Sequence, residues 1–148
     1  MRALVQRVAR AEVRVEGQVV GAIGRGILVL LGVAPEDDAV TARGLARRVV
    51  EQRIHADAEG RTNLALAEVA GAALVVSQFT LYADTRRGRR PGFTGAAQPA
   101  HAAAIYEGFC AALEELGVPT ERGRFGAAME VELVNDGPFT LWLDTVDR

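Results

Sequence analysis

Hydrophobic and polar residues alternate along the first part of the chain, the pattern of strands with one buried face. The alternation covers residues 3–8 and 11–20, and residues 16–18 provide a turn, so we expect a hairpin of short strands here. The continuous apolar run at residues 27–31 predicts a strand buried on both faces. The glycines of residues 21–26 have the wrong spacing for a phosphate loop and precede a strand, so we interpret them as turn residues.

Two segments have the periodicity of amphipathic helices. Residues 35–38, Pro-Glu-Asp-Asp, are typical of a helix start, and apolar residues recur near one face of the helix predicted after them. The second helix is expected over residues 99–116, with Gly117 as its stop. Its apolar positions are Ile105, Phe109, Leu113 and Leu116.

The remaining pattern completes the predicted fold. Residues 56–60 make a turn, and residues 72–81 read as a second buried strand. Two further strands, at residues 129–134 and 139–144, bracket a Gly-Pro turn. We therefore expect an α+β fold over residues 1–148: a single domain with a strongly bent sheet or partial β-barrel covered by two helices.

Composition and charge narrow the function classes. Of the 148 residues, 49% are hydrophobic and 24% are charged, which excludes a largely disordered chain. All 17 basic residues are arginine, so chemistry that needs a lysine amine, such as a Schiff base, is excluded. The net charge of −2 gives no global attraction to nucleic acid, so any such binding must depend on a local patch.

Several expectations concern what the chain lacks. The single cysteine, Cys110, cannot form an intrachain disulfide and is interpreted as a small buried hydrophobe. The first residues lack the apolar core of a signal peptide, and the uncharged stretch at residues 69–83 is shorter than the ~18 apolar residues of a membrane span. We expect a soluble cytoplasmic protein. The sequence has no Cys/His cluster, His-Glu-x-x-His or calcium-loop pattern, so we expect no metal and no cofactor.

The candidate catalytic groups lack an evident base. His55 follows the first predicted helix and His101 lies in the first turn of the second, and we interpret both as solvated or cap-satisfying residues. A triad assembled across the fold stays open, but no nucleophile-elbow motif supports one. Ser77, Gln78 and Thr80 therefore stand alone. A hydroxyl without a base is a poor catalyst for a stable amide, whereas an activated ester whose own neighbouring hydroxyl assists requires only positioning and oxyanion donors.

Several short motifs match one known family in order and spacing. They are Ser-Gln-Phe-Thr-Leu at residues 77–81, Asn-Asp-Gly-Pro-Phe-Thr at 135–140, Gln-Arg-Val at 6–8, Asp-Ala-Glu-Gly at 57–60 and the arginine-rich segment 86–93. Together they resemble the D-aminoacyl-tRNA deacylases. The resemblance runs from residue 1 to about residue 143, essentially the whole chain.

The resemblance implies a cytoplasmic homodimer that hydrolyses the ester between a D-amino acid, or glycine, and the terminal adenosine of tRNA. It implies a cis peptide at Gly137-Pro138, inserted into the partner's active site with both carbonyls excluding an L side chain. The dipeptide alone favours trans, since only ~5–6% of X-Pro bonds in folded proteins are cis. The opposing wall and further lining would be Ser77, Gln78, Phe79, Thr80, Phe125 and Met129. Because no base is evident, we favour a role for the 2′-hydroxyl of the terminal adenosine over Thr80 as nucleophile.

Two departures from the family pattern concern the pocket rim. Phe139 replaces an expected valine after the proline, and residues 125–129 read Phe-Gly-Ala-Ala-Met in place of Phe-Ala-Ala-Asp-Met, which leaves Ala128 without a carboxylate. Neither change touches Gly137 or Pro138, so we expect chiral selection to hold; the pocket rim and its tolerance for different substrates are the properties that these departures leave open.

The arginine loop and the function itself each keep an alternative. Arg86, Arg87, Arg89 and Arg90 form either a solvated basic loop or a binding site for phosphates of the tRNA acceptor end. The competing functions are a non-catalytic RNA-binding or strand-pairing dimer, and a Ser/Thr hydrolase of small esters. A comparison of D-linked and L-linked aminoacyl-tRNA with a simple ester separates all three.

Overall fold

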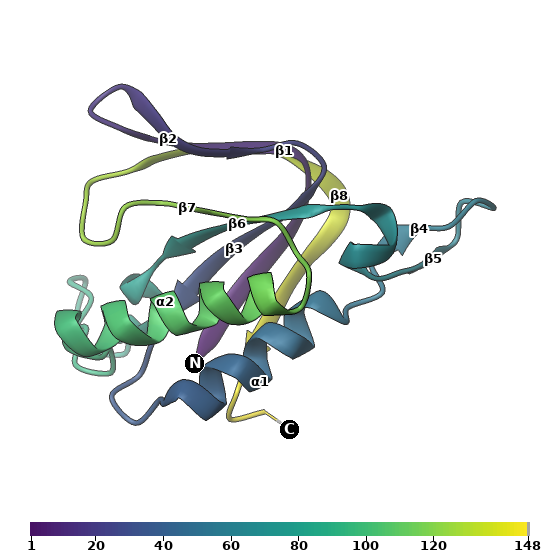
Figure 1. Cartoon of the computed structure of the whole chain (residues 1–148). Helices are drawn as coiled ribbons and strands as arrows, with labels where there is room; N and C mark the ends of the chain where they lie inside the picture. Colours follow the sequence, from purple (N-terminus) through teal and green to yellow (C-terminus); the bar gives the residue numbers. More distant parts are fainter. Residues whose placement is uncertain (148) are drawn as a thin grey trace.

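Strands and helices are mixed along the chain, and the computed structural model describes residues 1–147 (Figure 1). The strands are β1 (Arg2–Val15), β2 (Gln18–Ile23), β3 (Gly26–Gly32), β4 (His55–Ala56), β5 (Thr62–Leu64), β6 (Ala72–Ser77), β7 (Thr120–Arg122) and β8 (Glu130–Asp144). The helices are α1 (Ala39–Val50) and α2 (Pro99–Glu115), with short 3-10 helices η1 (Leu66–Val69) and η2 (Phe79–Tyr82). No helix among these is long and apolar enough to cross a lipid bilayer.

The main sheet has the order β2-β1-β3-β6-β7, and β8 pairs with β1 on the side away from β3 (Figure 1). β3, β6 and β7 are mutually parallel, whereas β1 is antiparallel to all three of its partners. β2 and β7, at the two ends of this strand order, are in contact, which shows that the sheet is strongly bent. A Cβ on Gly21 would lie 2.6 Å from the carbonyl oxygen of Arg122, so only glycine permits this approach. The expected strongly bent sheet is confirmed.

Two helices cover one face of this sheet, as expected (Figure 1). α1 begins after Asp38, whose side chain accepts a hydrogen bond from the Thr41 N–H at 2.8 Å and caps the helix. α2 begins with Pro99 at its first position and is followed by Gly117, which has a left-handed φ of +82°. Both predicted helices are therefore confirmed; α2 matches its predicted range to within about one residue, and α1 ends at Val50.

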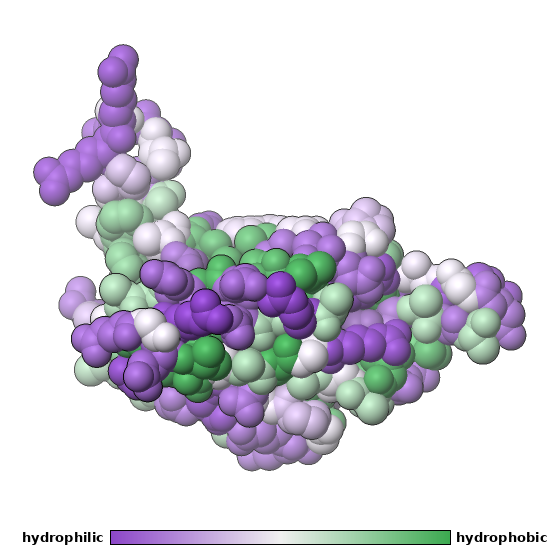
Figure 2. Space-filling model, turned by 90° about the horizontal axis from the view of Figure 1, so that it is seen from above, coloured by the Kyte–Doolittle hydropathy of each residue, from purple (hydrophilic) through white to green (hydrophobic). Residues whose placement is uncertain are grey.

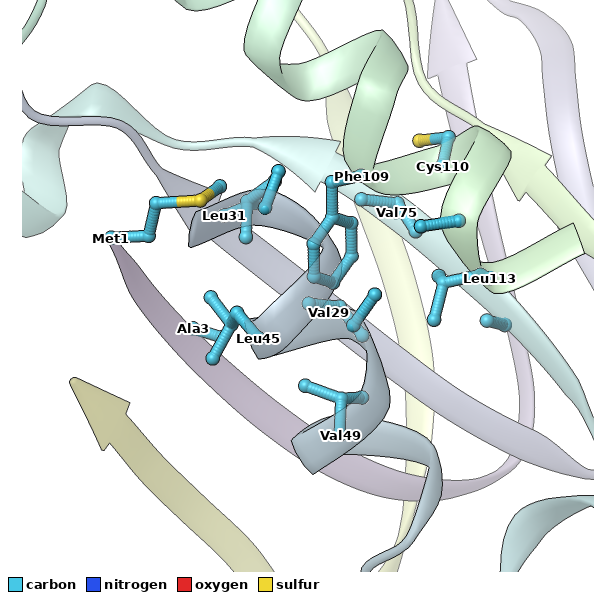
Figure 3. Packing of buried hydrophobic residues seen from close by; sticks show 14 of the residues in the cluster. Met1, Ala3, Val29, Leu31, Leu45, Val49, Val75, Phe109, Cys110 and Leu113 are labelled. Carbon is cyan, nitrogen blue, oxygen red and sulfur yellow. The ribbon is translucent and has the colours of Figure 1, made fainter. Parts of the chain in front are cut away.

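The main hydrophobic core lies between these helices and the sheet. Phe109 of α2 is fully buried and points into the space between α1 and the strands, where Leu45, Val29 and Val75 surround it (Figure 3). Cys110 is also buried, and burial raises the pKa of its thiol to about 12. The interpretation of Cys110 as a buried small hydrophobe is confirmed.

Two strands are longer than the sequence pattern predicts. β1 is one strand from Arg2 to Val15, so the expected break between residues 8 and 11 is wrong, although the turn before β2 is confirmed. β8 is also one strand, not the two that we expected around the Gly-Pro turn. In both cases a shift of register between β1 and β8 interrupts the alternation without ending the strand.

The strand predicted at residues 72–81 is longer than the strand observed there, β6. β6 ends at Ser77, and the chain then turns through Gln78 into η2. Gln78 keeps one ladder bond, from its N–H to the carbonyl of Leu31 at 2.8 Å, but its ψ of 78° leaves the strand conformation. The polar residues of this motif thus lie where the strand ends.

Candidate functional site

A pocket of about 520 Å³ opens where the parallel strands end. Val33 follows β3, Ser77 ends β6, and Phe125 follows β7, so three neighbouring carboxyl ends contribute to one wall. The start of α2 closes another side. Crevices outside the carboxyl ends of parallel strands are common ligand sites in α/β sheets, and this pocket has that position. Its lining residues are Val33, Val76, Ser77, Gln78, Phe79, Phe93, Ala96, Ala97, Gln98, Pro99, Ala102, Phe125, Gly126, Ala127, Met129 and Val131.

The turn from β6 into η2 explains how the polar groups of the first motif, residues 77–81, are arranged. Ser77, Gln78 and Phe79 line the pocket, while Thr80 lies on η2 beside it and is exposed. The Gln78 amide donates a hydrogen bond to the Thr80 hydroxyl oxygen, which joins the two side chains. The motif therefore supplies a hydroxyl, an amide and main-chain groups at one edge of the pocket.

Aromatic residues shape the rim and the opposite wall. Phe79 and Phe93 are exposed and meet edge to face, with ring centroids 5.0 Å apart. Phe125 packs against Tyr106, with ring centroids 6.0 Å apart, and lines the pocket together with Met129. Ala128 lies in the same segment but is exposed and outside the lining. Phe93 and the first residues of α2 belong to the pocket although the sequence analysis does not single them out.

The pocket is uncharged. Among the described residues that line it, none has an ionisable side chain. His101 lies on α2 and is exposed, and its Nε2 is 2.8 Å from the carbonyl oxygen of Asp37, which agrees with a solvated, hydrogen-bonded histidine. Within residues 1–147, no group of three or more His, Cys, Asp and Glu side chains is arranged to hold a metal ion.

His55 differs from its expected role. It is 1% exposed on β4, and its Nε2 has no hydrogen-bond partner in the described part of the chain, so the interpretation as a solvated or cap-satisfying residue is wrong. Burial, reinforced by the charges of Arg25 and Arg7, lowers the pKa of His55 below its ordinary 6.5 although Asp136 opposes the shift. Burial thus favours the neutral form of the imidazole.

The second motif forms a bulge on β8. Gln6 pairs with Thr140 and Val8 pairs with Asn135, so residues 136–139 all stand opposite Arg7. Gly137 and Pro138 are exposed on this bulge, and the peptide bond between them is cis, not the trans form that the dipeptide alone favours. Neither residue lines the pocket of the same chain.

Arg7 anchors the bulge and is the principal residue whose role the sequence does not indicate. Its guanidinium donates to the carbonyl oxygens of Asp136 at 2.9 Å and Gly137 at 3.0 Å. It also donates to the carbonyl oxygen of Ile54 at 2.5 Å, which ties the bulge to the segment before β4. Its Cζ lies 4.6 Å from the ring centroid of Phe139, so the residue that departs from the family pattern packs against this anchor.

The arginine-rich loop extends from the pocket rim. The main chains of Asp84 and Gly92 exchange two hydrogen bonds, of 2.7 and 2.9 Å, that close the base of the loop. Asp84 also accepts hydrogen bonds from the side chain of Arg86, which hold the pKa of its carboxyl below the usual range. Figure 2 shows a hydrophilic arm rising from the body at the end of the molecule where Figure 1 places this loop. Arg87, Arg89 and Arg90 are exposed and have no ion pair among the described residues.

Comparisons with known proteins agree with one another. The family model described as D-Tyr-tRNA(Tyr) deacylase matches residues 4–144. A protein of Anaeromyxobacter dehalogenans named D-aminoacyl-tRNA deacylase is 61% identical over 145 residues, which cover 98% of this chain and 97% of that protein. A protein of Chloroflexus aurantiacus with the same name is 55% identical over 147 residues, with 99% and 92% covered.

Solved structures share the fold. The structure titled c-Myc DNA Unwinding Element Binding Protein has a TM-score of 0.92 and 37% identity, with 98% of this chain and 99% of that chain covered. A probable eukaryotic D-amino acid tRNA deacylase has a TM-score of 0.81 at 19% identity, with 96% and 97% covered, and is similar in fold.

Proposed function

The chain belongs to the D-Tyr-tRNA(Tyr) deacylase family, and from that premise we propose that it hydrolyses the ester linking a D-amino acid to the terminal adenosine of tRNA. Water adds to the ester carbonyl carbon, the bond to the ribose oxygen breaks, and that oxygen takes up a proton. The products are the free D-amino acid and tRNA. Such a substrate places the reaction in the cytoplasm, where aminoacylated tRNA is used.

The uncharged pocket supports a substrate-assisted mechanism. A hydrolase that activates its own nucleophile needs a base within hydrogen-bond reach, and no lining residue among those described is a base. The Thr80 hydroxyl already accepts a hydrogen bond from the Gln78 amide. The 2′-hydroxyl of the terminal adenosine lies next to the ester by its own covalent structure and can assist proton transfer there. The protein then supplies orientation and hydrogen-bond donors to the developing oxyanion.

We place chiral selection at the exposed bulge of a second subunit. In one chain the bulge stands beside β4 and opposite Arg7, which pairs with the start of β3, whereas the pocket lies at the carboxyl ends of β3 and β6. Gly137 and Pro138 have no functional side-chain groups, so any reading of the substrate by them uses main-chain carbonyls. A homodimer that inserts the bulge into the partner's pocket brings the two motifs together. Exposed apolar residues on β8, Val134 and Trp142, provide contact area for such a partner.

This arrangement selects by exclusion of an L side chain. Glycine has no side chain to exclude, so glycyl-tRNA is accepted as a substrate. The esters of D-amino acids with chemically different side chains are hydrolysed with similar efficiency. The arginine loop, at the pocket rim, binds phosphates of the acceptor end of tRNA.

Four substrates test the reaction. We expect loss of D-tyrosyl-tRNA and glycyl-tRNA, with L-tyrosyl-tRNA and a nitrophenyl ester unchanged. Hydrolysis of the L form or of the simple ester at a comparable rate contradicts the chiral deacylase. Binding of tRNA with no hydrolysis indicates the RNA-binding alternative.

One variant and one modified substrate test the mechanism. Thr80→Ala should keep most of the deacylation rate, because its hydroxyl is not the nucleophile, and D-tyrosyl-tRNA that lacks the terminal 2′-hydroxyl should be nearly inert. Thr62→Ala, an exposed threonine on β5, is the matched control. An inactive Thr80→Ala together with normal turnover of the deoxy substrate identifies a protein nucleophile instead.

A further inference from the structure

The 3-10 helix η2 has little packing of its own. It is four residues long, none of its residues is buried, and no side chain caps its N-terminal end. A short 3-10 turn of this kind is not stable by itself. Since η2 carries Phe79 and Thr80, the geometry of the pocket edge depends on whatever else holds this turn.

Arg2 makes the contacts that hold η2. Its Nη1 donates to the carbonyl oxygen of Leu81 at 2.8 Å, an acceptor at the end of the turn. Its Cζ lies 4.3 Å from the ring centroid of Tyr82, which adds a stacking contact with the last residue of η2. One side chain thus contacts the main chain and a side chain of the same turn.

Arg2 is itself held from the other side. Its Nε donates to the Asp144 carboxylate at 2.9 Å, and Asp144 is 8% exposed. Burial opposes the charge on Asp144, but the Val146 N–H and Arg2 outweigh it and keep the pKa of this carboxyl below its usual value. The guanidinium also lies 5.7 Å from the ring centroid of Trp142. The position of Arg2 is therefore determined by β8 and not by η2 alone.

Tyr82 also packs η2 against the sheet. A Cβ on Gly32 would come within 3.1 Å of the Tyr82 ring, so the ring rests directly on the end of β3. Behind it lies a second cavity of about 350 Å³, lined in part by Arg2, Tyr82 and Asp144. η2 thus borders both hollows, since Phe79 lines the pocket and Tyr82 lines this cavity.

We infer that Arg2 is a positioning residue of the deacylase, which fixes η2 through Leu81 and Tyr82 and so sets Gln78 and Thr80 at the pocket edge. The inference rests on the proposed function for its effect on the reaction. Its structural half, the ordering of η2 by Arg2, stands on the contacts alone.

The chain supplies a matched control on the same strand. Arg10 of β1 also pairs with a carboxylate of β8, Glu132, at 2.7 Å, but this pair is exposed and contacts neither η2 nor the pocket. Arg2→Met and Arg10→Met therefore each remove one ion pair between the same two strands, although the Arg2 pair is the more buried, and only the first removes the contacts with η2.

Hydrogen exchange tests the ordering of η2 without reference to activity. The N–H groups of Leu81 and Ala83 donate within the turn to Gln78 and Thr80. In Arg2→Met we expect both to exchange roughly tenfold faster or more, since a hydrogen bond from a charged donor has been lost, and in Arg10→Met to be unchanged. Asp144→Asn, which keeps a side chain of similar size, should give an intermediate increase.

Kinetics test the consequence for the reaction. Arg2→Met should lower kcat for D-tyrosyl-tRNA roughly tenfold with little change in KM, because positioning and not tRNA affinity is lost, while Arg2→Lys restores part of the rate. Equal effects of Arg2→Met and Arg10→Met, in exchange or in kcat, overturn the inference. A wild-type protein inert toward D-tyrosyl-tRNA refutes the proposed function, and the exchange result then still decides whether Arg2 orders η2.

Discussion

Arg7→Met is the sharpest stability test that the bulge on β8 offers. The substitution keeps a long side chain over Phe139 but removes the donors to three carbonyl oxygens, those of Ile54, Asp136 and Gly137. The Arg7 side chain is 11% exposed, so water replaces these hydrogen bonds only in part.

The magnitude follows from the number and setting of these bonds. A hydrogen bond to a charged donor contributes roughly 1.5–3 kcal/mol, and exposed ones contribute less. Two of the three acceptors are on the exposed bulge and one is partly buried, so we expect a loss of about 2–4 kcal/mol in the free energy of unfolding. Arg7→Lys keeps the charge but cannot reach three acceptors at once, and should recover less than half of the loss.

Urea unfolding at fixed protein concentration measures this change, since stability depends on concentration if the chain dimerises. Arg10→Met is the control, because its exposed ion pair should contribute at most about 1 kcal/mol. Deacylation of D-tyrosyl-tRNA should fall in parallel in Arg7→Met, as the carbonyl of Gly137 loses its anchor. A loss no larger than that of the control refutes the reasoning that Arg7 holds the bulge.

Two further predictions concern charge. His55 has a folded-state pKa below 6.5, so the unfolded chain takes up this proton first and stability should decline as pH falls below about 6.5, by up to about 1.4 kcal/mol per pH unit. His55→Phe should remove that part of the decline in urea titrations between about pH 5 and pH 7, and an unchanged slope contradicts it. Arg87, Arg89 and Arg90 have no ion pair among the described residues, and replacing all three by alanine should weaken tRNA binding. The slope of the logarithm of the binding constant against the logarithm of the salt concentration should become less steep by up to about 3, with D-over-L selectivity unchanged. Arg86→Ala should have a smaller effect because Arg86 is paired with Asp84, and an unchanged salt slope in the triple variant indicates ordinary solvated surface.

The helices and the buried strands could be predicted because their signals are local. Asp38 caps α1 and Gly117 follows α2, so each boundary is marked by a residue whose physical role is independent of the rest of the fold. The short strands β4, β5 and β7 carry no such signal. β7 has three residues and is defined by its pairing with β6, which only the folded chain creates.

β1 and β8 are each one strand where the sequence pattern predicts two, and this difference also arises from pairing in the folded chain. Ala9 and Arg10 are both exposed in the middle of β1, where strict alternation allows only one. The register shift against β8 explains this, and it depends on a strand more than a hundred residues away. Alternation alone therefore reads a bulge as the end of a strand.

The candidate site was predictable as a set of motifs and not as an arrangement. Ser77 to Phe79 could be singled out because polar residues end an apolar run. The contact of Arg7 with Gly137 and the burial of His55 depend on the folded chain, and no local pattern encodes them. Resemblance to a family brings such residues into view without stating what each one touches.

Because the pocket lining is uncharged, the pH dependence of the proposed reaction should come from the substrate and not from the protein. With no ionisable group on the described lining, and with a glycine and a proline as the proposed closing residues, the α-ammonium of the aminoacyl group is the titratable group nearest the scissile ester. The pH dependence of the reaction then arises from the α-ammonium group of the substrate. An ester of a hydroxy acid, which has no amine, should lack that pH dependence. Such an enzyme can change residues near its pocket without changing a catalytic pKa.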